Sequence, residues 1–424
     1  MKQRRRTSFF CTQCGNGSPN WSGRCPACGS WNTMVEEPVQ EGKGRLGSPS
    51  RKSVEAVRID SIPEEDGERI PTGIPEFDRV LGGGLFKGSM ALLGGEPGIG
   101  KSTLMLQLSA FLAGAGETVL YATAEESAGQ IASRARRIGC ASGNILILPE
   151  TRLEEIESAL ERTGAGILIV DSIQTVYSEA LTSGPGSVAQ VRHCAAELVS
   201  LTKPRGKTSL IVGHVTKDGS LAGPKVLEHL VDTVIGFEGD SNRPHRLLRS
   251  LKNRFGPTNE LGVFEMTRQG LKGIAEASAF FLGRRQDGLP GGVVCAVMEG
   301  TRPFLVEVQA LTSPTRYGFP QRSANGIDSR RLPMLLAVLE KRCGLELGAQ
   351  DVYVNVAGGA NLSDPGADLA ICLAVASSRL DRPIPAGLAV SAEVGLGGEL
   401  RPVSSFDRRL REARSLGFNL FAGS

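Results

Sequence analysis

Apolar and polar positions alternate in blocks along most of the chain, as short apolar runs followed by longer helix-like stretches. The short runs predict buried strands, and the longer stretches predict covering helices. The alternation predicts an α/β fold built on a parallel sheet. The predicted strands are residues 89–93, 118–122, 144–148, 166–171, 208–213 and 233–237, and the predicted helices are residues 104–112, 126–138, 153–163 and 188–201.

The pattern changes near residue 275. Beyond it we predict two strands, residues 291–298 and 304–309, and two helices, residues 332–340 and 367–377. Residues 35–68 mix Glu, Lys, Gly, Pro and Ser without periodicity, which is typical of a linker. The predicted organisation is a small domain of residues 1–34, a linker of residues 35–68, a large domain of residues 69–274 and a further domain of residues 275–424.

Composition narrows the class of protein only modestly. The 424 residues allow two to four domains, and an apolar content of 40% supports ordinary globular cores. The net charge of +3 is weak, but the first 35 residues contain no acidic side chain. The basic side chains of this segment are Lys2, Arg4, Arg5, Arg6 and Arg24.

No apolar stretch approaches the ~20 residues that a membrane span needs. The basic start has no apolar segment behind it, so we expect no secretory signal, no membrane partner and a cytoplasmic protein. Several of the nine cysteines are scattered as reduced core thiols would be. These are Cys140, Cys194, Cys295, Cys343 and Cys372.

A phosphate-binding loop is the most specific motif. Residues 95–103 match G-x-x-x-x-G-K-[ST], between a predicted strand and a predicted helix. Glycines let backbone N–H groups face phosphate oxygens, while the lysine reaches the β- and γ-phosphates of ATP and the serine hydroxyl binds Mg²⁺. A Gly-rich turn with a surface lysine would not account for these flanks. The predicted nucleotide-binding residues are Gly95, Glu96, Pro97, Gly98, Ile99, Gly100, Lys101, Ser102 and Thr103.

Four residues at or just beyond strand ends complete the predicted ATPase site, since functional residues of a parallel sheet gather at the carboxyl ends of its strands. Asp171 is the second predicted magnesium ligand, with a helix cap or turn as the alternative. Glu125 is the first choice for the group that activates water and Glu126 the second, unless both are solvated acids at a helix start. His214 either senses the γ-phosphate or satisfies a loop.

A short basic motif, residues 252–256 (Lys-Asn-Arg-Phe-Gly), follows the last predicted core strand. Lys252 and Arg254 are predicted to neutralise charge in the transition state, as arginine fingers do. Such fingers often come from a neighbouring subunit, so the motif suggests a ring or filament. Taken alone, it is only a charged turn.

The N-terminal segment contains two C-x-x-C pairs, a spacing that predicts a structural Zn²⁺ site with all four ligands from the protein. Disulfides or a redox pair are the alternatives. Trp21 and Trp31 flank the second pair and form either a small core or a surface for stacking bases; we favour the core. The predicted zinc ligands are Cys11, Cys14, Cys25 and Cys28.

Together, the paired cysteines with neighbouring tryptophans, the phosphate-binding loop and the motif at residues 252–256 resemble the bacterial RadA (Sms) family of RecA-related ATPases. The resemblance spans the whole chain. It implies a RecA-like P-loop ATPase core and a DNA-stimulated helicase that promotes branch migration in homologous recombination and DNA repair. It also implies a homohexamer, single-stranded and branched DNA as partners, and a RecA-type recombinase as a protein partner.

The resemblance also assigns roles to residues. Lys252 and Arg254 would act on a neighbour's nucleotide, and Glu125 would be the catalytic glutamate. Residues 216–225, with Lys217 and Lys225 as phosphate contacts, and the Gly- and Ser-rich residues 177–190 resemble DNA-facing loops, the latter suited to mobility. Ordinary surface lysines are the alternative.

The last domain resembles the α+β proteolytic domain of Lon, which uses a Ser–Lys dyad. Ala367 stands where the serine should be, and Asp407 stands where the lysine should be. We therefore expect no peptidase activity and interpret the domain as a platform for oligomerisation and DNA binding. Its candidate phosphate contacts are Arg284, Arg285, Arg302, Arg316, Arg322, Arg330 and Arg331.

Two other functions compete with a DNA motor. An ATP-dependent Lon-type protease is disfavoured by Ala367 and Asp407, and a KaiC-like signalling ATPase is disfavoured by the zinc motif together with the Lon-like domain. The chain stops at Ser424, where the family usually continues with a further strand and helix, so a truncated or short member is expected.

Overall fold

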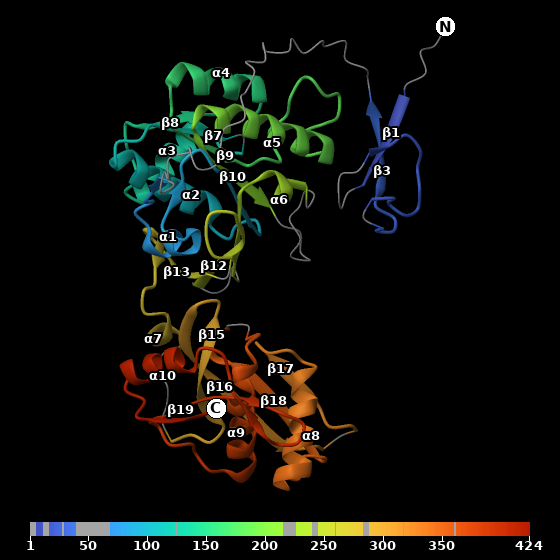
Figure 1. The fold of residues 1–424 in the computed structure, drawn as a ribbon, viewed down its shortest axis with the longest axis vertical. Coiled ribbons are helices and arrows are strands. Elements are labelled where there is room, and N and C mark those ends of the chain that lie inside the picture. Colours follow the sequence, from blue (N-terminus) through green and yellow to red (C-terminus); the bar gives the residue numbers. More distant parts are fainter. Residues whose placement is uncertain are drawn as a thin grey trace, which may run out of the picture. The chain divides into compact units, whose positions relative to one another are not determined.

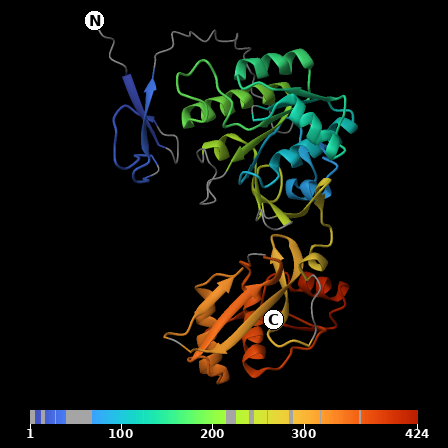
Figure 2. The same cartoon turned by 180° about the vertical axis from the view of Figure 1, so that it is seen from behind.

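The chain divides into two compact units, Met1–Gly273 and Ile274–Ser424 (Figures 1 and 2). The computed structural model describes residues 6–11, 17–27, 29–39, 68–123, 125–214, 226–239, 245–258, 260–282, 288–316, 318–359 and 362–424. Several predictions lie outside these residues: Cys14, Cys28, residues 40–67 of the linker, residues 215–225 with Lys217 and Lys225, Arg284 and Arg285.

A nine-stranded sheet forms the centre of the first unit, in the order β14-β13-β12-β11-β6-β10-β9-β7-β8. Its parallel strands are β6 (Met90–Gly95), β7 (Val119–Thr123), β8 (Ile145–Leu148), β9 (Ile167–Asp171), β10 (Thr208–His214) and β11 (Thr233–Glu238). An antiparallel extension that we did not predict follows: β12 (His245–Asn253), β13 (Leu261–Thr267) and β14 (Gly270–Gly273).

Helices cover both faces of this sheet, because successive strand residues point to opposite sides. In β7, Tyr121 packs into the core beneath one set of helices, and Leu120 packs into the core beneath the other. The first set is α1 (Pro75–Leu81), α2 (Lys101–Gly114) and α3 (Ala128–Arg137). The second set is α4 (Leu153–Thr163), α5 (Val188–Thr202) and α6 (Val226–Leu230). The predicted α/β architecture is confirmed.

Short elements complete this unit. The strands β4 (Arg69–Ile70) and β5 (Leu85–Phe86) form a small antiparallel pair, and the 3₁₀ turn η2 (Lys203–Arg205) ends α5. Residues 177–190 are tied together by the buried side chain of Gln190. Its amide nitrogen donates to the carbonyl oxygens of Ser178 and Ser183 at 3.0 and 2.9 Å. These contacts connect the two ends of the segment, and its mobility stays a prediction.

The N-terminal segment is a small ribbon of three strands, β1 (Arg6–Cys11), β2 (Gly17–Ser18) and β3 (Met34–Val39). Its core contains Cys11, Cys25 and Met34. The expectation that the tryptophans form this core is wrong: Trp21 is 60% exposed and Trp31 is 70% exposed. The cysteines and Met34 fill the small interior in their place.

The second unit contains a mixed six-stranded sheet in the order β17-β18-β16-β15-β19-β22. These strands are β15 (Gly292–Glu299), β16 (Arg302–Pro314), β17 (Arg322–Asn325), β18 (Gln350–Val356), β19 (Leu388–Ser391) and β22 (Leu420–Gly423). A hairpin adds β20 (Glu393–Val394) and β21 (Leu400–Arg401). The helices are α7 (Ala277–Leu282), α8 (Arg331–Cys343), α9 (Asp368–Leu380) and α10 (Phe406–Ser415), with 3₁₀ turns η3 (Ala357–Gly359) and η4 (Pro365–Ala367).

None of the helices in the described part of the chain combines the length and apolar character that crossing a bilayer requires. The longest, α5, contains 15 residues, and part of its surface is polar. A bilayer span needs about 20 predominantly apolar residues.

Candidate functional site

The loop between β6 and α2 is shaped to receive an anion. Gly100 precedes α2 with φ of 115°, and in the described part of the chain no side chain caps the helix. The first N–H groups of α2 are therefore available to a ligand. A Cβ atom on Gly100 would lie 2.5 Å from Cε of Met266, and one on Gly95 would lie 2.6 Å from the Phe237 carbonyl oxygen. Neither position admits a side chain without displacing its neighbour.

Lys101 begins α2 and is only 4% exposed. Its ammonium group donates to the carbonyl oxygens of Gly95 and Glu96, each at 2.8 Å. Burial lowers its pKa below the ordinary value, although the nearby charges of Asp171 and Glu125 act in the opposite direction. The lysine is thus folded onto the loop, beside the position that phosphate oxygens would occupy.

Asp171 ends β9 and meets the loop from the neighbouring part of the sheet. It is 5% exposed, and its Oδ2 accepts a hydrogen bond from the Tyr121 hydroxyl at 2.7 Å. Burial raises the pKa of Asp171, while hydrogen bonds from Tyr121 and Ser102 act to lower it. Burial, followed by the charge of Asp171, also raises the pKa of Tyr121 well above its ordinary value. The structure therefore brings together Ser102 and Asp171, the two predicted magnesium ligands.

Glu125 lies beyond the end of β7, between the ends of β9 and β10. Its Oε1 accepts from the Ser172 hydroxyl at 2.7 Å and lies 3.1 Å from Nε2 of His214. Burial would raise the pKa of Glu125, but these two hydrogen bonds outweigh it, so the pKa is below the ordinary value. The carboxylate is ionised at neutral pH and remains 43% exposed.

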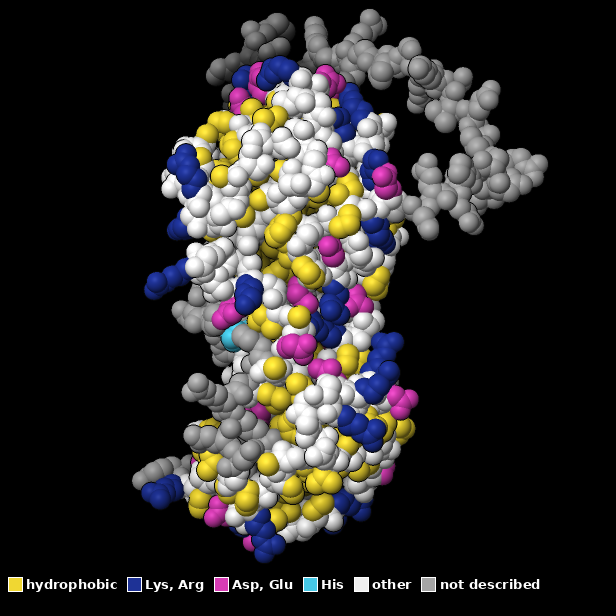
Figure 3. Space-filling view, turned by 90° about the vertical axis from the view of Figure 1, so that its left-hand side faces the viewer, with side chains coloured by type: hydrophobic (Ala, Val, Ile, Leu, Met, Phe, Trp, Pro, Cys, Tyr) yellow, Lys and Arg dark blue, Asp and Glu magenta, His cyan; other side chains and the backbone are white. Residues whose placement is uncertain are grey.

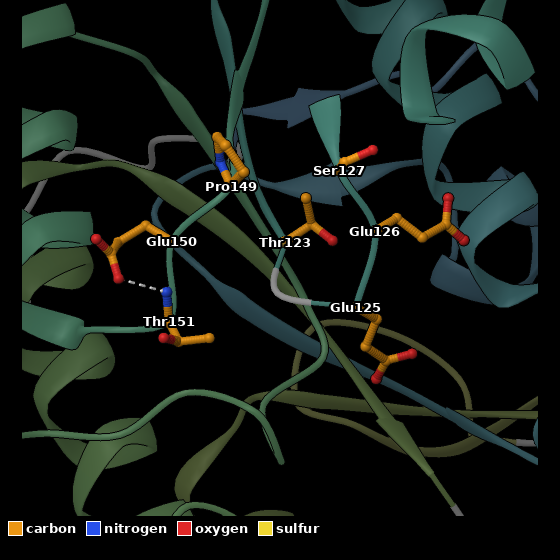
Figure 4. A pocket seen from close by; sticks show the side chains of 7 residues that line it. All are labelled: Thr123, Glu125, Glu126, Ser127, Pro149, Glu150 and Thr151. Carbon is orange, nitrogen blue, oxygen red and sulfur yellow. Dashed lines mark hydrogen bonds between the residues drawn. The ribbon is translucent and has the colours of Figure 1, made fainter. Parts of the chain in front are cut away.

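Glu126 has different surroundings from its neighbour. Its carboxylate forms an ion pair with Arg134 of α3, and the side chain points away from that of Glu125 (Figure 4). The reason is local: Ser127 caps α3 through a capping box with Gln130, which fixes where the helix begins. Both glutamates line a hollow of about 260 Å³, whose walls are Thr123, Glu125, Glu126, Ser127, Pro149, Glu150 and Thr151 (Figure 4).

Glu150 forms the opposite wall of this hollow. The backbone N–H groups of Arg152 and Thr151 donate to its Oε1 at 3.0 and 2.8 Å and lower the pKa of Glu150 to about 2. His214 ends β10 near the same edge of the sheet, and within the described residues its buried Nδ1 has no hydrogen-bond partner. The segment that follows, residues 215–225, lies outside those residues.

The basic motif at residues 252–256 lies at the opposite ends of the strands, where β6 and β11 begin. Asn253 of β12 pairs with Thr233 of β11, which pairs with Ala91 of β6, whereas the phosphate-binding loop begins at Gly95. The four residues from Ala91 to Gly95 correspond to roughly 13 Å along β6. The expectation that the motif follows the sheet is wrong for Lys252 and Asn253, which are the last residues of β12.

Buried contacts hold this motif in place. Lys252 donates to the carbonyl oxygens of Glu228 and Val231 at 2.5 and 2.8 Å, at the end of α6. Burial, followed by the charge of Arg254, lowers the pKa of Lys252. The Phe255 ring stacks on that of Phe86 with centroids 3.9 Å apart.

Asp232 holds the motif in place from the position just before β11, and our sequence analysis did not predict this role. It is 1% exposed, and its Oδ2 accepts from the Met90 N–H at 3.0 Å. Its Oδ1 pairs with Lys203 at 2.6 Å and with Arg254 at 3.2 Å. The side chain of Arg254 nevertheless remains 52% exposed, so of the two cations in the motif it is the more accessible.

The candidate DNA contacts of the second unit differ in availability. Arg302 is 8% exposed and donates to the carbonyl oxygens of Ile274 and Ala275, so we withdraw it as a phosphate contact. Arg322 is also committed to backbone carbonyls, including that of Leu347 at 2.8 Å, whereas Arg316 is exposed. Basic and acidic side chains are interspersed on the face shown in Figure 3, without a continuous basic surface.

The other two arginines that we predicted as phosphate contacts, Arg330 and Arg331, are paired with carboxylates. Arg331 binds the buried Asp368, and Arg330, which is exposed, binds Asp328 at 2.9 Å. A guanidinium that already has a carboxylate partner is a weaker candidate for a phosphate contact than a free one.

The ribbon fits a metal site. Cys11 and Cys25 are fully buried members of one cluster, and the N–H of Gly29 donates to the Cys25 carbonyl oxygen at 2.9 Å, closing a tight turn with φ of 74° at Gly29. Thiolates from two such turns suit a tetrahedral ion. The two remaining predicted ligands lie outside the described residues, so the four-ligand set stays a prediction.

Two family models match the chain, one over the large α/β region and one over the ribbon. Residues 57–220 match the family model described as AAA domain, and residues 9–36 match the model described as Rubredoxin metal binding domain. The first match identifies the larger region as an ATPase domain, and the second identifies the ribbon as a metal-binding one.

Relatives match almost the entire chain. The DNA repair protein RadA of Bacillus subtilis is 50% identical over 417 residues, which are 97% of this chain and 91% of that protein. The RadA proteins of Pseudomonas aeruginosa and Chlamydia trachomatis are 48% and 44% identical, over 97% and 99% of this chain and 91% and 92% of their own lengths. The ATPase region, the metal-binding ribbon and this full-length similarity together show that the chain belongs to the family of the DNA repair protein RadA.

Proposed function

We propose that this chain is a DNA-stimulated ATPase motor of DNA repair and homologous recombination. The similarity to DNA repair proteins supports the role in DNA repair. The observation that carries the proposal is the position of Glu125, an ionised carboxylate held by Ser172 and His214 beside the phosphate-binding loop. A carboxylate in that position can activate water for attack on a γ-phosphate.

Each residue of the site has a proposed task. The backbone N–H groups of residues 95–103 and the ammonium of Lys101 bind the phosphates, while Ser102 and Asp171 hold Mg²⁺. When bound, the ion neutralises charge on the phosphoryl oxygens. Glu125 takes the proton from the attacking water, and His214 orients Glu125 through the 3.1 Å contact.

The position of the basic motif supports a site shared between subunits. Arg254 and Lys252 lie at the ends of the strands opposite to the phosphate-binding loop. We propose that they serve the nucleotide of a neighbouring subunit in a homohexameric ring. Arg254 is the main finger because of its exposure, and Lys252 must first leave the carbonyl oxygens at the end of α6.

The ring would act on single-stranded and branched DNA as a helicase that promotes branch migration, together with a RecA-type recombinase. Support for these finer assignments comes from the resemblance of the motifs and from the names of the relatives. Lys217 and Lys225 remain candidate phosphate contacts, and they belong to the segment that connects His214 to α6.

The second unit is proposed as a Lon-like platform without peptidase activity. Ala367 and Asp407 provide no Ser–Lys dyad. The surrounding space is filled by Arg409, which is 1% exposed and donates to Asp364 at 2.5 Å and to Ser391 at 3.1 Å. An added Cβ on Gly366 would lie 2.8 Å from Nη1 of Arg409, so this guanidinium lies directly beside Ala367's neighbour in the chain.

In the ribbon we propose a structural Zn²⁺ ion, held by Cys11, Cys14, Cys25 and Cys28. The buried positions of Cys11 and Cys25 support this assignment. Because a segment this small has little apolar core, metal binding would supply much of its folding free energy.

A steady-state ATPase assay with and without single-stranded DNA tests the function. We expect DNA to increase turnover and Lys101→Ala to abolish it while circular dichroism remains unchanged, because the loop loses its phosphate-binding cation. Turnover that is insensitive to DNA, accompanied by cleavage of casein, would instead favour a Lon-type protease. Turnover that survives in Lys101→Ala would refute the assigned site.

A further inference from the structure

The ribbon exposes both tryptophans of the chain. Trp21 is 60% exposed and Trp31 is 70% exposed, although a ring of this size normally buries most of its surface. Cys11, Cys25 and Met34 supply the interior, so the indole rings are not needed for it. Two large aromatic rings on a segment this small point to a ligand rather than to the fold.

The two rings border one patch. A Cβ atom on Gly23 would lie 3.7 Å from Cη2 of Trp21 and 3.9 Å from Cζ3 of Trp31, so the absence of a side chain keeps the space between them open. The guanidinium carbon of Arg24 lies 5.9 Å from the centroid of the Trp31 ring. We call Trp21, Gly23, Arg24 and Trp31 the tryptophan surface.

Hydrogen bonds connect the patch to the ribbon backbone. Nε of Arg24 donates to the Gly29 carbonyl oxygen at 3.0 Å, and the N–H of Asn32 donates to the Gly23 carbonyl oxygen at 2.8 Å. These bonds connect the tryptophan surface to the turn that contains Cys25. Aromatic side chains on a fixed backbone lose little conformational entropy when they bind a ligand.

Charge identifies the class of ligand. The first 35 residues contain five basic side chains and no acidic one, which suits a polyanion. Exposed indoles next to an arginine are a combination that stacks bases and contacts phosphates in proteins that bind single strands. A protein partner would explain the apolar rings, but the adjacent Arg24 and the excess of basic residues among residues 1–35 favour a polyanion.

We propose that the tryptophan surface stacks unpaired bases of single-stranded DNA, as a binding site on the ribbon that is separate from the ATPase site. This inference rests on the proposed function in so far as the protein must bind DNA. It assigns the ribbon a second DNA-binding site, which binds unpaired bases. Trp21 and Trp31 are the stacking residues, and Arg24 is a cation beside them.

Intrinsic fluorescence of the full-length protein tests this directly, because both tryptophans of the chain belong to the surface. We expect a thymidine oligonucleotide to quench the emission, and an oligonucleotide of equal length without bases to leave it nearly unchanged. The two ligands carry the same phosphates, so their difference reports stacking. Anisotropy of labelled DNA, measured in parallel, reports total binding.

Substitutions provide the second measurement. Trp21→Ala and Trp31→Ala should each weaken binding of the thymidine oligonucleotide roughly tenfold, and Trp→Phe at the same positions should restore most of the affinity. Val35→Ala is the matched control, since Val35 is another exposed apolar residue of the ribbon, at 48%. An unchanged zinc content verifies that each variant retains the ribbon fold.

The outcomes separate the two proposals. If the thymidine oligonucleotide binds by anisotropy while the emission is unchanged and the alanine variants keep full affinity, the tryptophan surface does not bind DNA and a protein partner becomes the better explanation. If the oligonucleotide does not bind at all and does not stimulate turnover, the proposed function fails along with this inference.

Discussion

At the scale of single residues, Glu125 and Glu126 are adjacent in sequence but differ in what they can do. Glu125 faces the edge that holds the phosphate-binding loop, with Ser172 and His214 as hydrogen-bond partners. Glu126 is paired with Arg134, which neutralises its charge and holds it away from that edge (Figure 4). Of the two, Glu125 has the contacts that suit the proposed role of accepting a proton from water.

We therefore expect Glu125→Gln to lower the turnover of ATP by roughly 10²- to 10⁴-fold, because the amide cannot accept the proton. Glu126→Gln is the matched control, and turnover should stay within a few-fold of the parent. Steady-state ATPase measurements in saturating ATP decide between them. An equal loss of turnover in both variants would contradict the assignment of Glu125, and not Glu126, as the proton acceptor.

Ser172 provides a pH-dependent prediction. Its hydrogen bond helps to keep the pKa of Glu125 below the ordinary value, so the base form persists at acidic pH. In Ser172→Ala this bond is lost, the pKa of Glu125 rises, and the acidic limb of the turnover–pH profile moves to higher pH. Ser200→Ala is the control, because the Ser200 hydroxyl donates to the Glu197 carbonyl oxygen within α5, and the limb should stay in place. An unmoved limb in Ser172→Ala would contradict the role of this bond.

The sequence predicts some of these residues and not others, for a physical reason. The phosphate-binding loop and Asp171 are recognisable because a contiguous motif and a strand end carry them. The partners Tyr121 and Ser172 are not, because their contacts depend on β7 pairing with β9, which no local pattern specifies. Likewise, the exposure of Trp21 and Trp31 depends on which side chains fill the ribbon core.

At the scale of elements, the parallel strands and their helices are predictable because each is a local apolar run. The antiparallel extension is not, since in β12 the polar residues Arg246 and Ser250 occupy buried positions while Leu251 is exposed, so the apolar pattern does not follow burial. That extension decides where the basic motif lies. In sequence the motif follows the predicted sheet, whereas in the structure β12 brings it back to the edge where β6 begins.

The second unit contains an ion pair whose value for stability can be measured. Arg409 of α10 and Asp364 are 1% and 8% exposed, so Arg409→Ala would leave a buried carboxylate without its partner. We expect a loss of about 3–5 kcal/mol in the free energy of unfolding of this unit. Circular dichroism in urea is the suitable signal, because both tryptophans lie in the ribbon.

The control for this change is Arg330→Ala. Arg330 also pairs with an aspartate, Asp328, but its side chain is 89% exposed. Exposed pairs contribute little to stability, so the urea midpoint should hardly move. Similar midpoints for Arg409→Ala and the parent protein would mean that the Asp364 carboxylate finds another partner, and that Arg409 does not lock the space around Ala367.

At the scale of the whole molecule, the sheet separates the two halves of the proposed catalytic site. The loop, Asp171 and Glu125 lie at the carboxyl ends of the parallel strands. Arg254 lies at their amino ends, several residues away along the strands. In a closed ring of identical subunits, each interface joins two different surfaces of the chain, and we propose that these two ends of the sheet are the ones that meet. Every nucleotide would then receive its loop from one chain and its finger from another.

Mixing inactive variants tests this sharing. Lys101→Ala lacks a working loop but keeps Arg254, and Arg254→Gln lacks the finger but keeps the loop, so a mixed ring contains some complete interfaces. An equal mixture should regain about one quarter of the parent turnover if subunits assort randomly and interfaces act independently. A mixture of Lys101→Ala with Glu125→Gln should regain none, since both residues serve the same chain's nucleotide. If neither mixture regains turnover, Arg254 does not act on the nucleotide of a neighbouring subunit.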